Sequence, residues 1–182
     1  MNFWATLIAY EIVWFAAVIG AGHGIVWPGV LGALLFAAWR LGVSPRRDVE
    51  LRLVVVTLLL GAVLETLWVR AGLVRYAVPW PLPETPAWLM ALWLAFALTI
   101  VPLFGYLHER SWLAAVFGAI SGPPAYLGAA RGWHAVLLPS PAWRTLAALA
   151  IGWGIALPLL CALAHRWLRE PARRARTEEN SA

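Results

Sequence analysis

Residues 51–71 read LRLVVVTLLLGAVLETLWVRA, an apolar run interrupted by one acid, Glu65. A run of this length matches the 17–25 residues that a helix needs to cross the hydrocarbon core of a bilayer, about 30 Å thick. Five further stretches of similar character follow the same pattern: Phe3–Gly20, Gly24–Gly42, Ala87–Leu107, Trp112–Gly132 and Ala142–Trp167. The sequence therefore predicts an all-α, polytopic membrane protein, a bundle of six transmembrane helices.

The composition leaves no room for a separate soluble domain. The chain has 182 residues, 62% of them hydrophobic, and a mean hydropathy of +0.74. A soluble protein this apolar would expose more apolar surface than solubility tolerates. The apolar runs are continuous, whereas strands of a membrane barrel alternate apolar and polar residues. We expect one transmembrane domain over residues 1–167 and a basic, then acidic, cytoplasmic tail over 168–182 that is disordered.

Arginine supplies all 14 basic residues and gives the chain a formal charge of +5. These charges lie in loops and the tail, so they do not indicate nucleic-acid binding. They indicate topology, because cytoplasmic loops carry an excess of basic residues. If both termini are cytoplasmic, the inside segments hold Arg40, Arg46, Arg47, Arg52, Arg110, Arg166, Arg169, Arg173, Arg174 and Arg176, and the outside ends hold Arg70, Arg75, Arg131 and Arg144. We therefore expect a multi-pass protein of the bacterial inner membrane with both termini in the cytoplasm.

Motifs of soluble enzymes and of metal sites are absent from the sequence. It has no glycine-rich phosphate loop, no nucleophile elbow, and no His-x-x-x-His or Cys-x-x-Cys spacing. No cofactor and no metal are expected, and no catalytic residue can be assigned.

Two carboxylates inside the apolar runs are the main candidates for function. Glu11 lies midway along the first run, and Glu65 lies in the outer half of the third. An ionisable residue within a membrane is costly, at about 2.5–3.5 kcal/mol near a helix centre, so it is rare unless it is paired or useful. Each carboxylate could equally serve as hydrogen-bonded packing between helices, and both interpretations stay open.

Four more residues near the outer side accompany Glu65. We expect a candidate ligand pocket in the outer leaflet formed by Glu65, Arg70, His23, Tyr126, Arg131 and Glu11. Glu65 and Arg70 are five residues apart, so they do not share a helix face. Sequence gives the depth of these residues but not their proximity, and His23 could simply be a turn residue.

The fifth run carries two further signals. Gly122-Pro123-Pro124 predicts a break in its outer half, because proline removes amide donors from a helix. Gly118 and Gly122, four residues apart, predict a face where a second helix approaches closely.

Three stretches support a family resemblance: residues 10–24 (YEIVWFAAVIGAGHG), 92–99 (LWLAFALT) and 118–126 (GAISGPPAY). They resemble a family of small bacterial inner-membrane proteins classed only as a domain of unknown function, over roughly residues 3–165. That family shows a Trp-Phe-x-x-Val-x-Gly helix, a Leu-Trp-x-x-Phe-Ala helix and a Gly-Pro-x-x-Tyr segment.

The chain departs from the family pattern at two places, and the genes found near those of the family suggest a functional link. The family more often has an amide in place of Glu11, and Asp-Ser in place of Glu65-Thr66. Its members are often encoded near genes for cyclopropane-fatty-acyl phospholipid synthase, which implies a link to membrane-lipid modification but assigns no activity.

Three functions remain open on this evidence. The first is binding or handling of a lipid or small amphiphile in the outer-leaflet pocket. The second is a membrane-embedded lipid-modifying enzyme that uses Glu65 as acid or base. The third is a scaffold for lipid-modifying enzymes, and we expect membrane lipids, and a membrane enzyme in the scaffold case, as partners.

Overall fold

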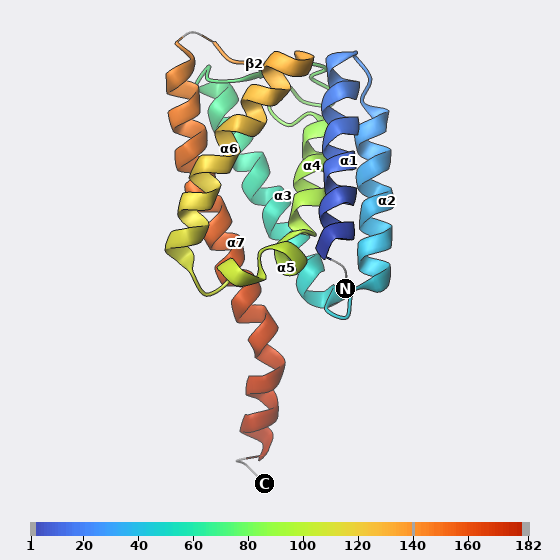
Figure 1. The fold of residues 1–182 in the computed structure, drawn as a ribbon, viewed down its shortest axis with the longest axis vertical. Helices are drawn as coiled ribbons and strands as arrows, with labels where there is room; N and C mark the ends of the chain where they lie inside the picture. The colour runs from blue at the N-terminus through green and yellow to red at the C-terminus, as the bar shows by residue number, and fades with distance from the viewer. Residues whose placement is uncertain (1–2, 140, 180–182) are drawn as a thin grey trace.

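The computed structural model describes residues 3–139 and 141–179, with side chains described as far as Glu170, and it confirms an all-α fold (Figure 1). The elements in chain order are the helices α1 (Phe3–Gly22), α2 (Trp27–Val43), α3 (Arg47–Arg70), α4 (Ala87–Ala97), α5 (Ile100–Leu103), α6 (Ser111–Trp133) and α7 (Ala142–Glu179), the 3-10 turn η1 (Gly105–Leu107), and two short strands, β1 (Arg75–Tyr76) and β2 (Val136–Leu137).

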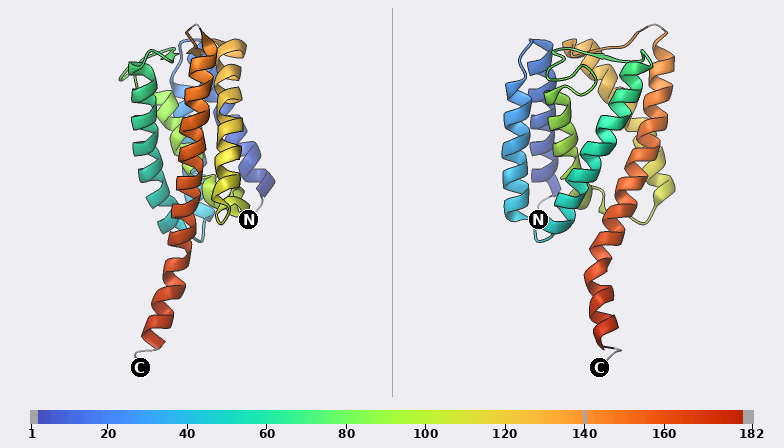
Figure 2. Two further views of the ribbon diagram at one scale, coloured as in Figure 1. Left: turned by 90° about the vertical axis from the view of Figure 1, so that its left-hand side faces the viewer. Right: turned by 180° about the vertical axis from the view of Figure 1, so that it is seen from behind.

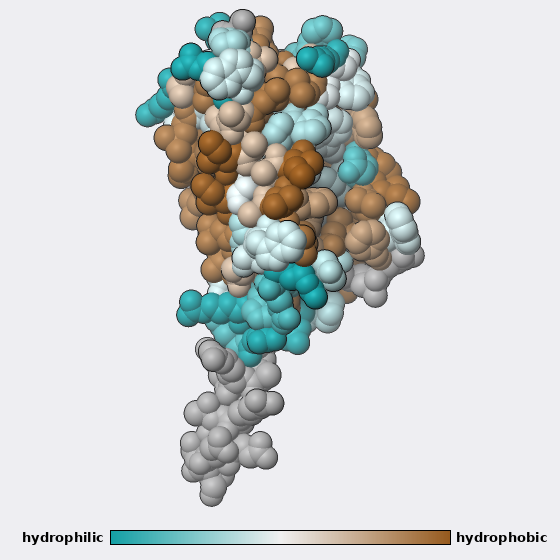
Figure 3. Space-filling view, turned by 60° about the vertical axis from the view of Figure 1, so that its left-hand side comes forward, coloured by the Kyte–Doolittle hydropathy of each residue, from teal (hydrophilic) through white to brown (hydrophobic). Residues whose placement is uncertain are grey.

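Four helices, α1, α3, α6 and α7, are long and apolar enough to cross a membrane. The helices α2 and α4, with 17 and 11 residues, are shorter apolar helices, so six spans of full length are not confirmed. The surface fits the same environment: on the face seen in Figure 3, apolar residues lie between hydrophilic residues at the two ends of the bundle, and large apolar side chains are exposed along α1, α2, α3, α6 and α7.

The fourth apolar run forms three short elements rather than one helix. Pro102 has no N–H to donate to the carbonyl of Leu98, so one α-helical hydrogen bond is missing at the residue that follows the end of α4. The Thr99 hydroxyl donates to the Phe96 carbonyl at 2.6 Å and closes α4 there. The expected helix over 87–107 is therefore divided into α4, α5 and η1.

The expected break in the fifth run is wrong. The helix α6 continues through Pro123 and Pro124 as far as Trp133. Gly118 and Gly122 lie against Trp153 of α7, where an added Cβ would come within 2.3 Å and 2.4 Å of Trp153 atoms. The long contact with α7 holds both halves of α6 in one helix, and the predicted close approach at this glycine face is confirmed.

The last helix does not end at Trp167, where the transmembrane domain was expected to stop. It continues to Glu179, so the first part of the tail expected to be disordered, over 168–179, is helical in the structure. Alanine, arginine and glutamate, which are frequent here, are strong helix formers. Residues 180–182 lie outside the described residues.

The two ends of the bundle differ in construction. The N-terminal end of α1 and the C-terminal end of α7 lie at the same end of the bundle (Figures 1 and 2). The α2–α3 turn lies there too, and next to it Arg40 and Glu50 form a fully buried ion pair. At the opposite end β1 and β2 pair antiparallel, with Tyr76 opposite Val136, and tie the α3–α4 loop to the segment after α6. Thr145 of α7 donates to the Leu73 carbonyl at 2.7 Å and anchors the same loop.

Replacing Gly118 by leucine should destabilise the fold, because the new side chain must displace the Trp153 backbone. Overpacking of this kind costs about 1–3 kcal/mol. We expect Gly118→Leu to lower the thermal unfolding midpoint of the detergent-solubilised protein. The control is Gly132→Leu on the same helix, where an added Cβ meets nothing within 4 Å. Equal midpoints for the two variants would contradict the packing described here.

Candidate functional site

A cavity of about 520 Å³ lies among α1, α4, α6 and α7. Its lining is mainly aromatic and aliphatic, with a few polar groups: Tyr10, Glu11, Thr99, Ser121 and Tyr126. Volume and lining are those of a typical small-molecule site, which is concave, mostly apolar and has few polar groups.

The cavity opens on the side of the bundle between α1 and α6. Glu11 and Ser121 line the cavity and are also exposed on the outer surface, and Phe117 is 49% exposed. The two helices touch only lightly, whereas α6 packs along most of its length on α7. The opening therefore lies on the apolar side surface of the bundle rather than at either polar end.

Glu65 lies fully buried behind the cavity wall and accepts three hydrogen bonds. Its Oε1 accepts from Trp93 Nε1 at 3.0 Å and from the Tyr126 hydroxyl at 2.5 Å, and its Oε2 accepts from the Tyr76 hydroxyl. An ionised carboxylate has only acceptor sites, so three donors match it. Without such partners, burial of the carboxylate would be strongly unfavourable.

The three donors come from three different elements. Trp93 lies on α4 and packs over Gly61 of α3, where an added Cβ would come within 2.4 Å of the indole ring. Gly61 and Glu65 are four residues apart and share a helix face. The missing side chain at Gly61 therefore makes room for the Trp93 indole. The indole N–H then reaches the Glu65 carboxylate one helical turn further along α3.

The strand pairing fixes the position of Tyr76. The strand β1 holds its backbone opposite Val136, and Trp88 packs edge-on against its ring with the centroids 5.9 Å apart. Trp88 is itself fixed by a 3.0 Å hydrogen bond from Nε1 to the Ala77 carbonyl. Burial raises the pKa of Tyr76 well above the usual 10.0, so this phenol keeps its proton and acts as a donor.

Tyr126 connects the carboxylate to the cavity. Its ring lines the cavity on α6, its hydroxyl donates to Glu65, and Trp68 packs edge-on against it at 6.0 Å. Trp93 also lines the cavity while donating to Glu65. Glu65 itself is not part of the lining, so it orients two cavity residues from behind.

The structure brings some of the expected pocket residues together and separates the others. Glu65 and Tyr126 are in direct contact, and Glu11 lies at the cavity opening. His23 is exposed in the α1–α2 turn, where its Nδ1 lies 2.8 Å from the Ile19 carbonyl oxygen. Arg131 lines a second hollow near β2, away from Glu65.

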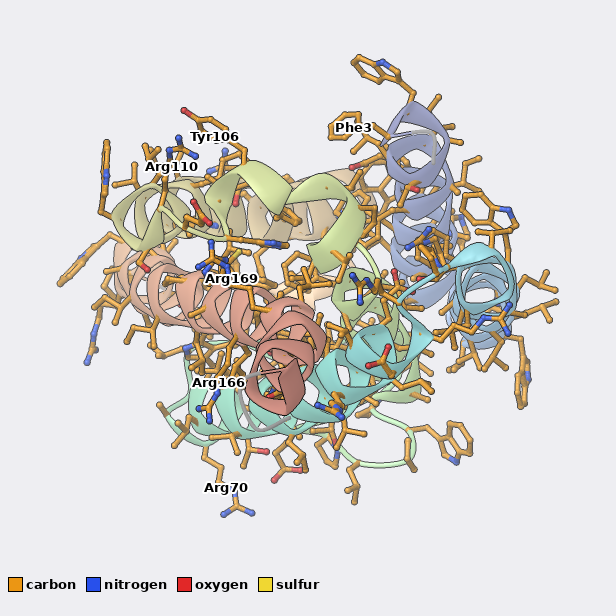
Figure 4. All side chains as sticks on the ribbon, turned by 90° about the horizontal axis from the view of Figure 1, so that it is seen from below. Phe3, Arg70, Tyr106, Arg110, Arg166 and Arg169 are labelled. Atoms are coloured by element: carbon orange, nitrogen blue, oxygen red, sulfur yellow. The ribbon has the colours of Figure 1, made fainter. Side chains whose placement is uncertain are left out.

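Arg70 also lies apart from the cavity. Its side chain is 73% exposed, and its Nε lies 3.6 Å from the Glu84 carboxylate in the α3–α4 loop. Figure 4 shows Arg70 projecting outward from the bundle. The spacing of five residues from Glu65 explains the separation, because it turns the two side chains to different faces of α3.

Sequence reasoning missed two of the three donors to Glu65. Tyr76 lies in a loop, where no periodicity indicates which side chains turn inward. Trp93 lies within an apolar run, where a tryptophan more often serves as bulky packing than as a hydrogen-bond donor. The small residue at Gly61, one turn before the acid, was the available signal that an aromatic ring packs there. Among the described residues, no group of three His, Cys, Asp or Glu side chains could hold a metal ion.

Removing one donor from Glu65 should destabilise the protein. We expect Tyr126→Phe to lower the free energy of unfolding by about 1–3 kcal/mol, because it leaves a buried carboxylate oxygen with one partner fewer. Glu65→Gln should do the same despite its equal shape, since its amide N–H₂ would point at a donor. Unfolding in detergent measures both. Tyr106→Phe is the control, because this side chain is 68% exposed. Unfolding free energies equal to that control would contradict the assigned hydrogen bonds.

Comparison with known proteins gives one positive result. No curated protein and no solved structure matches the chain. Its sequence matches a family described as "Protein of unknown function (DUF2878)" over residues 3–159. The expected membership of a family of unknown function is thereby confirmed: the chain belongs to the DUF2878 family.

Proposed function

We propose that this protein is an integral membrane protein that binds a lipid or small amphiphile in the cavity among α1, α4, α6 and α7. The observation that carries the proposal is the position of the opening: an aromatic cavity of about 520 Å³ reaches the surface between α1 and α6, where the lining residues Glu11, Ser121 and Phe117 are exposed. A ligand that enters this way comes from the bilayer, so it must have an apolar body.

The polar groups of the cavity support an amphiphile rather than a plain hydrocarbon. Tyr126, held by Glu65, gives the cavity a fixed polar point, and Glu11 and Thr99 add others. The rest of the lining is apolar, which suits the chain or ring system of the same molecule.

The other two functions receive less support. An enzyme that uses Glu65 directly as acid or base would need substrate access to a carboxylate that lies behind the lining and already accepts three hydrogen bonds. A scaffold for membrane enzymes could not use the face at Gly118 and Gly122, because Trp153 of α7 covers it.

A ligand held in the cavity should copurify with the protein. We expect the wild type to retain an amphiphile that is detected by native mass spectrometry and by extraction, and we expect Ala125→Trp to lose it, because Ala125 lines the cavity and the indole fills it. Val116→Trp on the outer surface of α6 is the control for an added indole. Equal retention by both variants would overturn the proposal.

We further propose that the protein lies in the bacterial inner membrane with both termini in the cytoplasm. The α2–α3 turn, the start of α6 next to Arg110 and the α7 extension lie at the end of the bundle where α1 begins and α7 ends (Figure 1), and these segments carry most of the arginines. This distribution supports the orientation, because cytoplasmic segments are rich in arginine.

Single cysteines test the orientation. In a Cys161→Ser background, a membrane-impermeant maleimide should label Leu82→Cys in intact cells whose outer membrane has been made permeable. It should label Glu109→Cys only after the inner membrane is opened, because Leu82 and Glu109 are exposed at opposite ends of the bundle. The reverse pattern would invert the topology.

A further inference from the structure

We infer that the cavity selects a hydrophobic cation, an ammonium or related onium group that carries apolar substituents. This inference rests on the proposed ligand cavity and adds the charge of its ligand. Two independent features of the described residues support it: the sign of the charges at the cavity and its aromatic wall.

The only charged side chain among the lining residues is an acid. Glu11 lies at the opening, midway along α1, and the described arginines and histidines all lie outside the lining. None of the ion pairs among the described residues involves Glu11, and its neighbours on the same helix, Ile8 and Ile12, are 57% and 63% exposed. An unpaired acid surrounded by bilayer-facing apolar side chains is costly, which makes a cationic ligand its natural partner.

Two hydroxyls of the lining already donate their hydrogens within the protein. Tyr126 uses its one hydroxyl hydrogen on Glu65, and Thr99 uses its own on the Phe96 carbonyl. A hydroxyl has a single donor, so neither of these two residues can donate a hydrogen bond to a ligand.

Two indoles of the wall also have their donors engaged. The N–H groups of Trp88 and Trp93 are donated to Ala77 and Glu65, whereas the buried Nε1 of Trp153 has no hydrogen-bond partner among the described residues. The selection for positive charge is therefore carried by the Glu11 carboxylate and by the aromatic wall.

The aromatic wall is continuous across three helices. Trp93 of α4 stacks on Trp153 of α7 with centroids 4.8 Å apart, Phe96 packs edge-on against Trp153 at 5.1 Å, and Tyr10 of α1 lies 6.4 Å from Phe96. Aromatic rings attract cations through their negative faces, and aromatic cages recognise quaternary ammonium groups. This attraction needs no hydrogen-bond donor on the ligand, so it extends the selection to fully substituted onium ions.

Binding of radiolabelled tetraphenylphosphonium to the protein in dodecyl maltoside micelles tests the inference. We expect saturable binding, weakened about tenfold by Glu11→Gln, because one unit of negative charge beside the cation is lost in a medium of low dielectric constant. Glu84→Gln is the matched control, since this carboxylate lies in the α3–α4 loop, outside the cavity. Loss of binding in Ala125→Trp, with retention in Val116→Trp, assigns the binding to the cavity.

Aryl competitors of similar size separate charge from apolarity. Neutral triphenylphosphine oxide and anionic tetraphenylborate should displace the label at least about tenfold less well than unlabelled tetraphenylphosphonium. If the neutral compound binds as tightly and Ala125→Trp abolishes both, the cation inference fails while the ligand cavity stands. If no compound binds in a way that Ala125→Trp abolishes, and no amphiphile copurifies, both proposals fail.

Two sources could supply such a cation, and a last pair of competitors separates them. Displacement by phosphatidylethanolamine, but not by phosphatidylglycerol, identifies the ammonium headgroup of a lipid. Displacement by decyltrimethylammonium alone identifies a free hydrophobic cation. Equal displacement by both phospholipids and by decanol would overturn the selection for charge.

Discussion

The burial of one carboxylate imposes the strictest constraint on this fold. Glu65 is completely enclosed, and its two oxygens need donors that the helix carrying it cannot supply. The donors come from α4, α6 and the β1 segment, so these three elements must meet α3 at one point to within hydrogen-bonding distance. Apolar packing alone would allow one helix to shift by a turn along its neighbour. The three hydrogen bonds to Glu65 exclude such a shift, because it would move the donors out of reach of the carboxylate.

Contacts between tryptophan rings and glycines also determine how the helices pack. Trp93 packs over Gly61, Trp153 over Gly122 and Trp68 over Gly152, each ring filling the space that a missing side chain leaves on the neighbouring helix. Small residues permit close approach of helices in apolar surroundings, where no hydrophobic force drives the helices together. Here they also fix two rings that border the cavity, because Trp93 and Trp153, each packed over a glycine, stack face to face.

The sequence was sufficient for the parts of the fold that depend on local character. Apolar runs predicted the long helices, and Gly118 with Gly122 predicted a close helix contact. Proline was a weaker signal: Pro123 and Pro124 stay inside α6, while Pro102 coincides with the division of the fourth run. The presence of a proline alone does not decide where a helix ends, since α7 also continues past Pro158 and Pro171.

The candidate site was predictable only in part for the same reason. Glu65 and Tyr126 could be chosen by residue type and depth, and they prove to be bonded to each other. Arg70 and Arg131 could not be excluded, because depth gives no information on which face a side chain occupies. Tyr76 could not be found at all, since the strand pairing that turns it inward joins segments separated by sixty residues of chain.

The donors to Glu65 all lie after α3 in the chain, and this order affects how the protein is inserted and assembled. Insertion in chain order places α3 in the bilayer before the elements that satisfy Glu65, because β1, α4 and α6 all follow it in the chain. The helix must therefore insert with an unsatisfied acid, and the valine and leucine residues around that acid compensate for its unfavourable transfer. The hydrogen-bonded centre is then completed from the C-terminal side, so a chain released before α6 would hold an inserted but incomplete bundle that quality-control proteases could recognise.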